Sequence, residues 1–253
     1  MRTVLNAVVA LTLTQLACSH TTARVVSAPA VMDADSVIAN YYRAIGGYAR
    51  LKSVTSRRMR GSYSEGTLEA ATDIVWRRPS LRRVNVDAPG FKYSEGFDAF
   101  TWELNLGTGK FVRDTGAAAD AGRRGAEFDE SFVDYRAKGH SVTLVGREHV
   151  LGRDTYRLRV RLSDGWEKEY FIDQSTFLIV AMRKAMPIHA AGPAVESLSS
   201  YEDWRDVDGL LVPHRFTERV TKTGALMNTL RWDRIEHNTP IADQEIRAPR
   251  RPI

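Results

Sequence analysis

The stretch 141–186 constrains this chain most, because its pattern is that of four consecutive strands joined by short turns. Within it, residues 155–162 alternate between apolar and polar without a break. A period of two is typical of a β-strand with one buried and one solvent-exposed face, since successive side chains point to opposite sides. The apolar face carries Tyr156, Leu158, Val160 and Leu162, and the polar face carries Thr155, Arg157, Arg159 and Arg161.

The charges around residues 163–165 predict the register of the central hairpin. With a three-residue turn there, Arg161 lies opposite Glu167, so that opposite charges meet on one face and apolar groups on the other. A two-residue turn would instead pair Leu162 with Glu167 and mix the faces. We therefore expect the three-residue turn, with Gly165 in the left-handed conformation that it needs. The expected pairs are Arg161–Glu167, Arg159–Glu169, Leu158–Tyr170 and Tyr156–Ile172.

Lys168 is the one charged residue on the apolar face of this hairpin, where it lies opposite Val160. Two explanations are open. Either the aliphatic stem packs on the core while the ammonium reaches water, or this face of the sheet borders a cavity.

The composition is that of an ordinary globular protein, with 43% hydrophobic and 26% charged residues over 253 positions. The formal charge of +5 comes mostly from arginines spread along the strands. A solvated, arginine-rich sheet face explains this distribution, and a surface attracted to anionic lipid or another acidic partner is the alternative. No motif supports binding to nucleic acid.

Residues 1–17 have the pattern of a bacterial secretory signal, with a positive start and an apolar run too short and too polar to span a bilayer. The Leu-Ala-Cys that ends at Cys18 resembles the end of a lipobox, where the cysteine is diacylated and becomes the N-terminus. Gln15 departs from that pattern, since lipoproteins usually carry leucine there. We expect Cys18 to be the lipid attachment site, while ordinary cleavage further on, for instance after Ala30, stays open. Ser19, in place of aspartate, favours the outer membrane.

Residues 18–32 are small and polar and are expected to form a tether. Residues 33–253 are expected to form a single domain, because no change in composition divides them. Near its start, Asp33 or Asp35 can cap a helix. The apolar stripe expected on that helix is Val37, Ile38, Tyr41, Ala44 and Ile45.

The remaining pattern predicts a mainly β (α+β) protein. Residues 114–128 favour a helix or helical loop, because the alanines at 117, 118, 119 and 121 promote a helix that three glycines weaken. Besides the four strands of 141–186, the expected strands are 54–64, 67–77, 80–86, 92–96, 99–105, 110–113, 195–205, 210–221 and 226–237.

No pattern in the sequence supports a metal, cofactor or catalytic site. The six histidines lack metal-ligand spacing, and there is a single cysteine. Glu127, Asp129 and Glu130 form an acidic cluster, which solvated charges explain better than an acid–base pair. The tryptophans are expected to pack in the core or to line a cavity. They are Trp76, Trp102, Trp166, Trp204 and Trp232.

Three segments carry a resemblance to a known family. Residues 132–140 (Phe-Val-Asp-Tyr-Arg-Ala-Lys-Gly-His) lead into the turns of 144–156, residues 201–213 read Tyr-Glu-Asp-Trp-Arg-Asp-Val-Asp-Gly-Leu-Leu-Val-Pro, and residues 41–47 read Tyr-Tyr-Arg-Ala-Ile-Gly-Gly. Together they resemble the bacterial outer-membrane lipoprotein-sorting (LolA-like) proteins over about residues 33–246. These motifs are turns and strand patterns, so they specify a fold better than an activity.

The resemblance implies an open, curved antiparallel half-barrel of about 11–13 strands, with helices covering its concave face. The space between them is apolar and accepts acyl chains, and the 114–128 segment would act as a lid. No individual cargo-binding residue is carried over from the family. The cavity candidates come from the helix stripe and the central hairpin: Val37, Tyr41, Ile45, Tyr156, Leu158, Val160, Tyr170 and Ile172. Cys18 places the chain nearer the anchored acceptor of that system than the soluble carrier.

The expected function is non-enzymatic binding of acyl chains or lipidated proteins by a monomer in the periplasm, anchored to the outer membrane through Cys18. An interaction module of the outer membrane with a filled core is the alternative. An envelope hydrolase would need a nucleophile and a base in contact, and the sequence nominates no such pair.

Overall fold

The structure, a computed structural model, describes residues 32–186 and 194–249, and within them four helices and thirteen strands. The helices are α1 (Ala34–Ala44), α2 (Tyr48–Ser53), α3 (Gly116–Gly125) and α4 (Asp243–Ile246). The strands are β1 (Ser56–Glu65), β2 (Leu68–Arg77), β3 (Leu81–Ala88), β4 (Phe91–Phe97), β5 (Thr101–Asn105), β6 (Lys110–Arg113), β7 (Ser141–Val150), β8 (Arg153–Arg161), β9 (Glu167–Asp173), β10 (Ile179–Met186), β11 (Val195–Val207), β12 (Leu210–Val220) and β13 (Leu226–His237).

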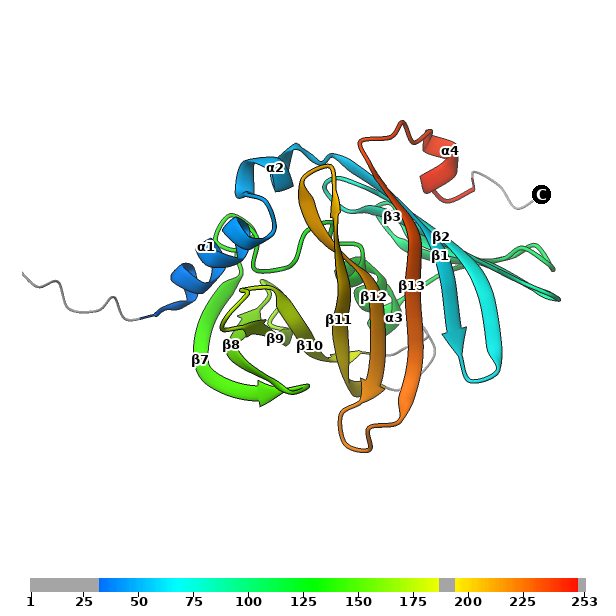
Figure 1. Ribbon diagram of the computed structural model, residues 1–253. Coiled ribbons are helices and arrows are strands. Elements are labelled where there is room, and N and C mark those ends of the chain that lie inside the picture. The colour runs from blue at the N-terminus through cyan, green and yellow to red at the C-terminus, as the bar shows by residue number, and fades with distance from the viewer. Residues whose placement is uncertain (1–31, 187–193, 250–253) are drawn as a thin grey trace, which may run out of the picture. The chain divides into compact units, whose positions relative to one another are not determined.

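All thirteen strands join in one antiparallel sheet, in the order β6-β5-β4-β3-β2-β1-β13-β12-β11-β10-β9-β8-β7. The sheet is open, with β6 and β7 at its two edges. Figure 1 shows it curving around α3. The predicted fold class, a mainly β, open and curved antiparallel sheet, is confirmed. We call the face of the sheet that carries α1 and α3 the inner face, and the opposite one the outer face.

The predicted register of the β8–β9 hairpin is confirmed. Arg161 pairs with Glu167, and Leu162 donates its backbone N–H to the carbonyl of Trp166 at 2.8 Å, which closes a three-residue turn. Gly165 has a φ of +87°. The remaining pairs also match: Arg159–Glu169, Leu158–Tyr170, Tyr156–Ile172 and Val160–Lys168. Local charge and hydrophobic alternation were therefore sufficient to set this register.

Helix α1 packs its apolar stripe on the inner face. Asp33 caps it by accepting the backbone N–H of Ser36 at 2.7 Å. Val37 and Tyr41 join the main core, where the Tyr41 ring meets the Phe132 ring edge-on with centroids 5.0 Å apart. Phe132 in turn lies edge-on against Tyr170, at 4.9 Å. The helix and the 128–135 segment thus fill the inner face over β8 and β9.

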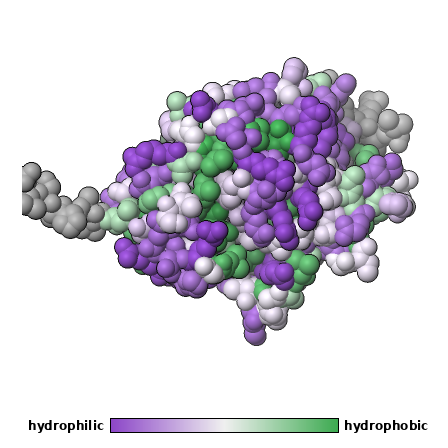
Figure 2. Space-filling view, in the orientation of Figure 1, coloured by the Kyte–Doolittle hydropathy of each residue, from purple (hydrophilic) through white to green (hydrophobic). Residues whose placement is uncertain are grey.

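The outer face is charged, as the alternation predicts. Arg183 of β10 bridges Glu148 of β7 and Glu169 of β9, at 2.9 and 3.0 Å. Arg159 adds a contact to Glu169 at 3.1 Å. Figure 2 shows that the side on which β11–β13 lie is largely hydrophilic, with hydrophobic residues in separate patches between the hydrophilic ones.

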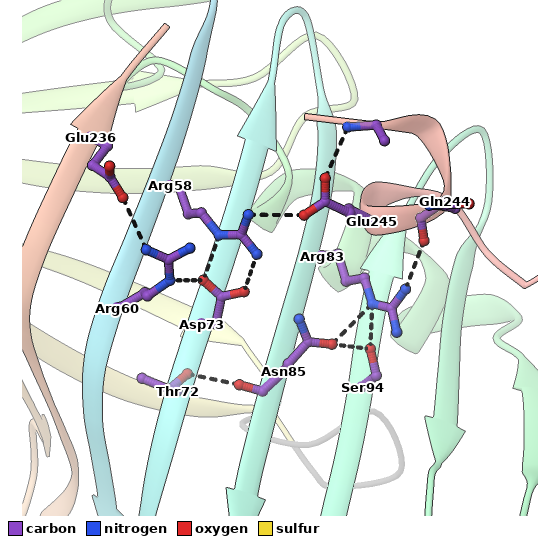
Figure 3. A network of polar contacts seen from close by, with 11 residues as sticks. Arg58, Arg60, Thr72, Asp73, Arg83, Asn85, Ser94, Glu236, Gln244 and Glu245 are labelled. Atoms are coloured by element: carbon purple, nitrogen blue, oxygen red, sulfur yellow. Dashed lines mark hydrogen bonds and ion pairs between the residues drawn. The ribbon is translucent and has the colours of Figure 1, made fainter. Parts of the chain in front are cut away.

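Helix α4 was not predicted, and it covers the outer face. Ile246 packs on Val75, whereas the neighbouring Ile74 belongs to the inner core, so α4 lies on the side opposite α3. Figure 3 shows the polar contacts that hold it. Arg58 donates to Glu245 of the helix at 2.8 Å and to Asp73 of β2 at 3.0 Å. Its four residues are too short for a recognisable helical period in the sequence.

Candidate functional site

The candidate site is a cavity of about 550 Å³ on the inner face of the sheet. Its walls come from β1–β5, the inner faces of β9–β13, the end of α1 and one side of α3. This volume lies within the range typical of sites for small molecules, about 300–1,000 Å³. The cavity is therefore large enough to hold an organic ligand.

Helix α3 covers this cavity and is held at two points. At one, in the first half of the helix, Thr101 of β5 donates its hydroxyl to the carbonyl of Ala119 at 2.8 Å. At the other, Arg123 and Arg124 both contact Asp164 in the β8–β9 turn, at 2.7 and 3.0 Å. Ala118 and Ala121 line the cavity. The small alanines predicted to favour helix therefore also leave space beneath it.

Apolar side chains form most of the wall over β1–β3 and β12–β13. They include Met59, Ile74, Val84, Val86, Val212, Phe216 and Leu230. Three of the five tryptophans, Trp76, Trp166 and Trp204, also line it. Trp102 and Trp232 are instead fully buried in the packed interior. The tryptophans thus divide between the two roles expected of them.

The residues named from the sequence as cavity candidates fall into two groups. Tyr41 and Ile45 lie on the wall. The other six lie in the packed core, outside the wall, because α1 and the 128–135 segment fill that part of the inner face; they are Val37, Tyr156, Leu158, Val160, Tyr170 and Ile172. Cys18 lies outside the described residues.

Sequence reasoning missed the polar centre of the cavity, which is built around Glu130. Its carboxylate accepts the Tyr170 hydroxyl at 2.8 Å and is also hydrogen-bonded to Tyr201. The Tyr170 oxygen accepts the backbone N–H of Ser131 at 3.2 Å, which fixes the hydroxyl toward Glu130. Burial raises the pKa of Glu130, whereas nearby Lys168 and the tyrosine hydroxyls oppose that rise.

The acidic cluster of residues 127–130 is not a set of solvated charges, so that prediction is wrong. Asp129 is only 4% exposed and contacts both Arg78 and Lys52. Glu127 contacts Lys138 at 2.6 Å. These acids lie in an irregular segment without a periodic pattern, so their burial could be recognised only once the opposite strands were in place.

Lys168 lies on the cavity wall, half-buried. Its ammonium nitrogen is 5.5 Å from the centre of the Tyr170 ring and 5.9 Å from that of Trp166. Of the two explanations for a charge on this face, the structure supports the cavity.

A second polar zone lies in the same cavity, on the strands toward the β6 edge. Glu95 of β4 and Glu103 of β5 are directly paired across the sheet, an arrangement in which like charges repel. Asp114, beside the start of α3, adds a third carboxylate. Burial, followed by Glu103 and Glu95, raises the pKa of Asp114 to about 6. We call Glu95, Glu103 and Asp114 the acidic zone.

Replacing Asp114 with asparagine is expected to stabilise the protein at pH 7 by about 1–3 kcal/mol. Because the folded-state pKa of Asp114 lies above its usual 3.8, the folded protein binds this proton more tightly than the unfolded chain does. The cost of ionising Asp114 therefore grows as the pH rises from the unfolded-state pKa of 3.8 to the folded-state pKa of about 6 and is fully present above it, so the gain from Asp114→Asn should shrink between pH 7 and pH 4. Urea unfolding at both pH values tests this, with the exposed Asp87→Asn as control. No gain in stability at pH 7 would mean that neighbouring groups compensate the repulsion between the carboxylates of the acidic zone.

No group of described residues is arranged to hold a metal ion, and no described helix is long and apolar enough to cross a membrane. His214 is buried, with its Nδ1 2.9 Å from the carbonyl of Val212, as expected for a core histidine.

No protein-family model and no curated protein matches the sequence. Three solved structures share the fold. A DUF1329 family protein from Desulfovibrio piger matches with a TM-score of 0.57 and 15% identity, over 82% of this chain and 95% of that one. A putative outer membrane lipoprotein-sorting protein domain from Vibrio parahaemolyticus gives 0.57 and 10%, over 83% and 94%. A LolA superfamily protein from Nitrosomonas europaea gives 0.56 and 13%, over 86% and 99%.

These matches confirm the resemblance at the level of fold. The chain has the LolA-like fold over nearly the whole length of each of the three neighbours. With identities of 10–15%, the likeness extends to the arrangement of strands and helices and leaves the ligand to be argued from the cavity itself.

Proposed function

We propose that this chain is a non-enzymatic binding protein of the cell envelope, whose cavity takes an acyl chain. The observation that carries the proposal is the cavity of about 550 Å³ between α3 and the inner face of the sheet, with an aliphatic and aromatic wall over β1–β3 and β12–β13. Burying an acyl chain there would contribute about 0.8 kcal/mol per methylene group. A protein that holds acyl chains needs a wall of this kind and no catalytic group.

The proposed setting follows from the N-terminal sequence. A secretory signal over 1–17, lipidation of Cys18 and a tether over 18–32 would hold the domain at the periplasmic side of the outer membrane. The neighbour from Vibrio parahaemolyticus is described as a putative outer membrane lipoprotein-sorting protein domain, and by analogy the ligand here would be a lipid or a lipidated protein.

An interaction module with a filled core is the second candidate. It is favoured by the half of the inner face over β8 and β9, where Leu158, Tyr170 and Ile172 are completely buried. The two candidates differ in what the hollow half does. A docking module does not require that half to admit a ligand, whereas an acyl carrier does.

A pair of substitutions on α3 separates these candidates. Ala121 lines the cavity and Ala117 is exposed on the same helix. In a titration with a fluorescent fatty acid, the wild type should bind, and Ala121→Trp should weaken binding at least about tenfold because the indole occupies the ligand's space. Ala117→Trp, which adds the same side chain outside, should bind like the wild type.

Absence of binding by the wild type, together with no lipid in an organic extract of the purified protein, would contradict the acyl-chain proposal and favour the docking module. Equal binding by both tryptophan variants would place the ligand outside this cavity.

A further inference from the structure

The cations on the cavity wall differ in whether they are neutralised. Arg124 contacts Asp164 at 3.0 Å, and Lys184 contacts Glu218 at 3.3 Å. Arg82 lies 3.6 Å from Glu95. Within 32–186 and 194–249, the other two cations of the wall, Arg57 and Lys168, form no ion pair.

Arg57 is held in place by groups that do not cancel its charge. Its Nε donates to Nε2 of His237 at 3.3 Å, and its guanidinium carbon lies 5.5 Å from the centre of the Phe128 ring. Burial and then the charge of Arg57 lower the pKa of His237 to about 4, so this histidine is neutral at pH 7. It supplies an acceptor and no counter-charge.

Lys168 is placed in a similar way. Its ammonium lies over Trp166 and Tyr170, where aromatic faces stabilise a cation without neutralising it. Glu130 is the carboxylate that acts on both Lys168 and Arg57, and it is already engaged by Tyr170 and Tyr201. Asp129 also acts on Arg57 and Glu127 also acts on Lys168, but Asp129 is paired with Arg78 and Lys52, and Glu127 with Lys138. We call Arg57, Lys168 and Glu130 the cationic centre.

The acidic zone and Lys168 lie toward opposite edges of the sheet, so the charge of the cavity wall differs from one side to the other. Glu95 and Glu103 lie on β4 and β5, toward the β6 edge of the sheet, whereas Lys168 lies on β9, toward the β7 edge. An anionic group that entered the cavity would be repelled by the former and attracted by the latter. The apolar walls do not favour an anionic group over a cationic one.

We infer that the ligand is an amphiphile with an anionic end group, carboxylate or phosphate, and that Arg57 and Lys168 bind that group while the chain lies along the apolar wall. This inference rests on the proposed function and specifies its substrate class. Binding would give both cations a charge-assisted hydrogen-bond partner.

The test compares cis-parinaric acid, a fluorescent long-chain carboxylate, with its neutral methyl ester, which has the same chain. The wild type should bind the acid at least about tenfold more tightly than the ester. Lys168→Met should remove most of that preference while leaving ester binding unchanged, and Arg57→Met should do the same. Unchanged ester binding also shows that the variant has kept its cavity.

Lys184→Met is the matched control. Lys184 is the direct cross-strand partner of Lys168 and carries the same charge, but Glu218 neutralises it. This variant should keep the preference for the acid, and an equal loss in both lysine variants would overturn the inference.

Three further outcomes are decisive. Equal affinity of the wild type for acid and ester would overturn the anionic end group while leaving the acyl-chain proposal standing. Tighter binding of an alkyltrimethylammonium ion of equal chain length would overturn it in favour of a cationic end group at the acidic zone. Binding of none of the three would overturn the proposed function as well.

Discussion

Replacing Asp129 with asparagine is expected to lower the free energy of unfolding by about 3–5 kcal/mol, because it leaves the largely buried Arg78 without its counter-charge. Asp129 is 4% exposed and lies between two cations. Its Oδ1 accepts Nη2 of Arg78 at 2.7 Å, and its Oδ2 contacts Lys52 at 3.2 Å. Arg78 also donates to the backbone carbonyls of Val54 and Leu51, so it cannot swing out to water without breaking the start of the sheet. Urea unfolding followed by tryptophan fluorescence measures the loss.

Asp134→Asn is the control for this substitution. Asp134 also contacts Lys52, at 2.8 Å, but it is 26% exposed. Its φ of +52° is one that asparagine tolerates. A more exposed ion pair contributes about 0–1 kcal/mol, so this variant should unfold almost like the wild type. If the two variants lost the same amount, burial of Asp129 would not be the cause.

Gly46→Ala is expected to cost about 3–5 kcal/mol, through a steric clash added to backbone strain. Gly46 follows α1 with a φ of +112°, and a Cβ there would lie 2.1 Å from the carbonyl oxygen of Gly209. The neighbouring Ile45 carbonyl accepts the N–H of Leu211 at 2.9 Å, so the end of α1 and the β11–β12 turn cannot easily separate. Leu210, which begins β12 directly after that turn, lines the cavity, so fatty-acid affinity should fall together with stability.

Gly47 provides the comparison that separates strain from clash. Its φ is +105°, similar to that of Gly46, but a Cβ there would meet nothing within 4 Å. Gly47→Ala should therefore show the strain alone, about 1–2 kcal/mol. Urea unfolding again measures the loss of stability. If the two variants lost the same free energy of unfolding, the close approach of Gly209 would not contribute to it.

The strands and the central hairpin were predictable because their information is local. Period-two alternation marks a strand regardless of its neighbours, and the Arg161–Glu167 pairing needs only a turn of known length. The cap at Asp33 and the α3 segment follow from equally local rules.

The site was less predictable, because it depends on which part of the inner face is filled. The apolar face of β8 has the same sequence pattern whether α1 or a ligand covers it. Leu158 was therefore expected at the cavity wall, whereas it lies in the core. Glu130 belongs to a segment without periodicity, and its partners Tyr170 and Tyr201 lie 40 and more residues away. Lys168 was the one sequence signal of the polar centre, as a charge placed on an apolar face.

The two open edges of the sheet bear on whether copies of the protein pair with one another. An unpaired edge strand is a template for cross-chain pairing and fibril growth. Here β6 offers only the four residues Lys110–Arg113, with a basic side chain at each end. At the other edge, β7 is interrupted by a register shift between Leu144 and Gly146. A short, charged edge and a kinked one are both poor templates, so the sheet can remain open without aggregating.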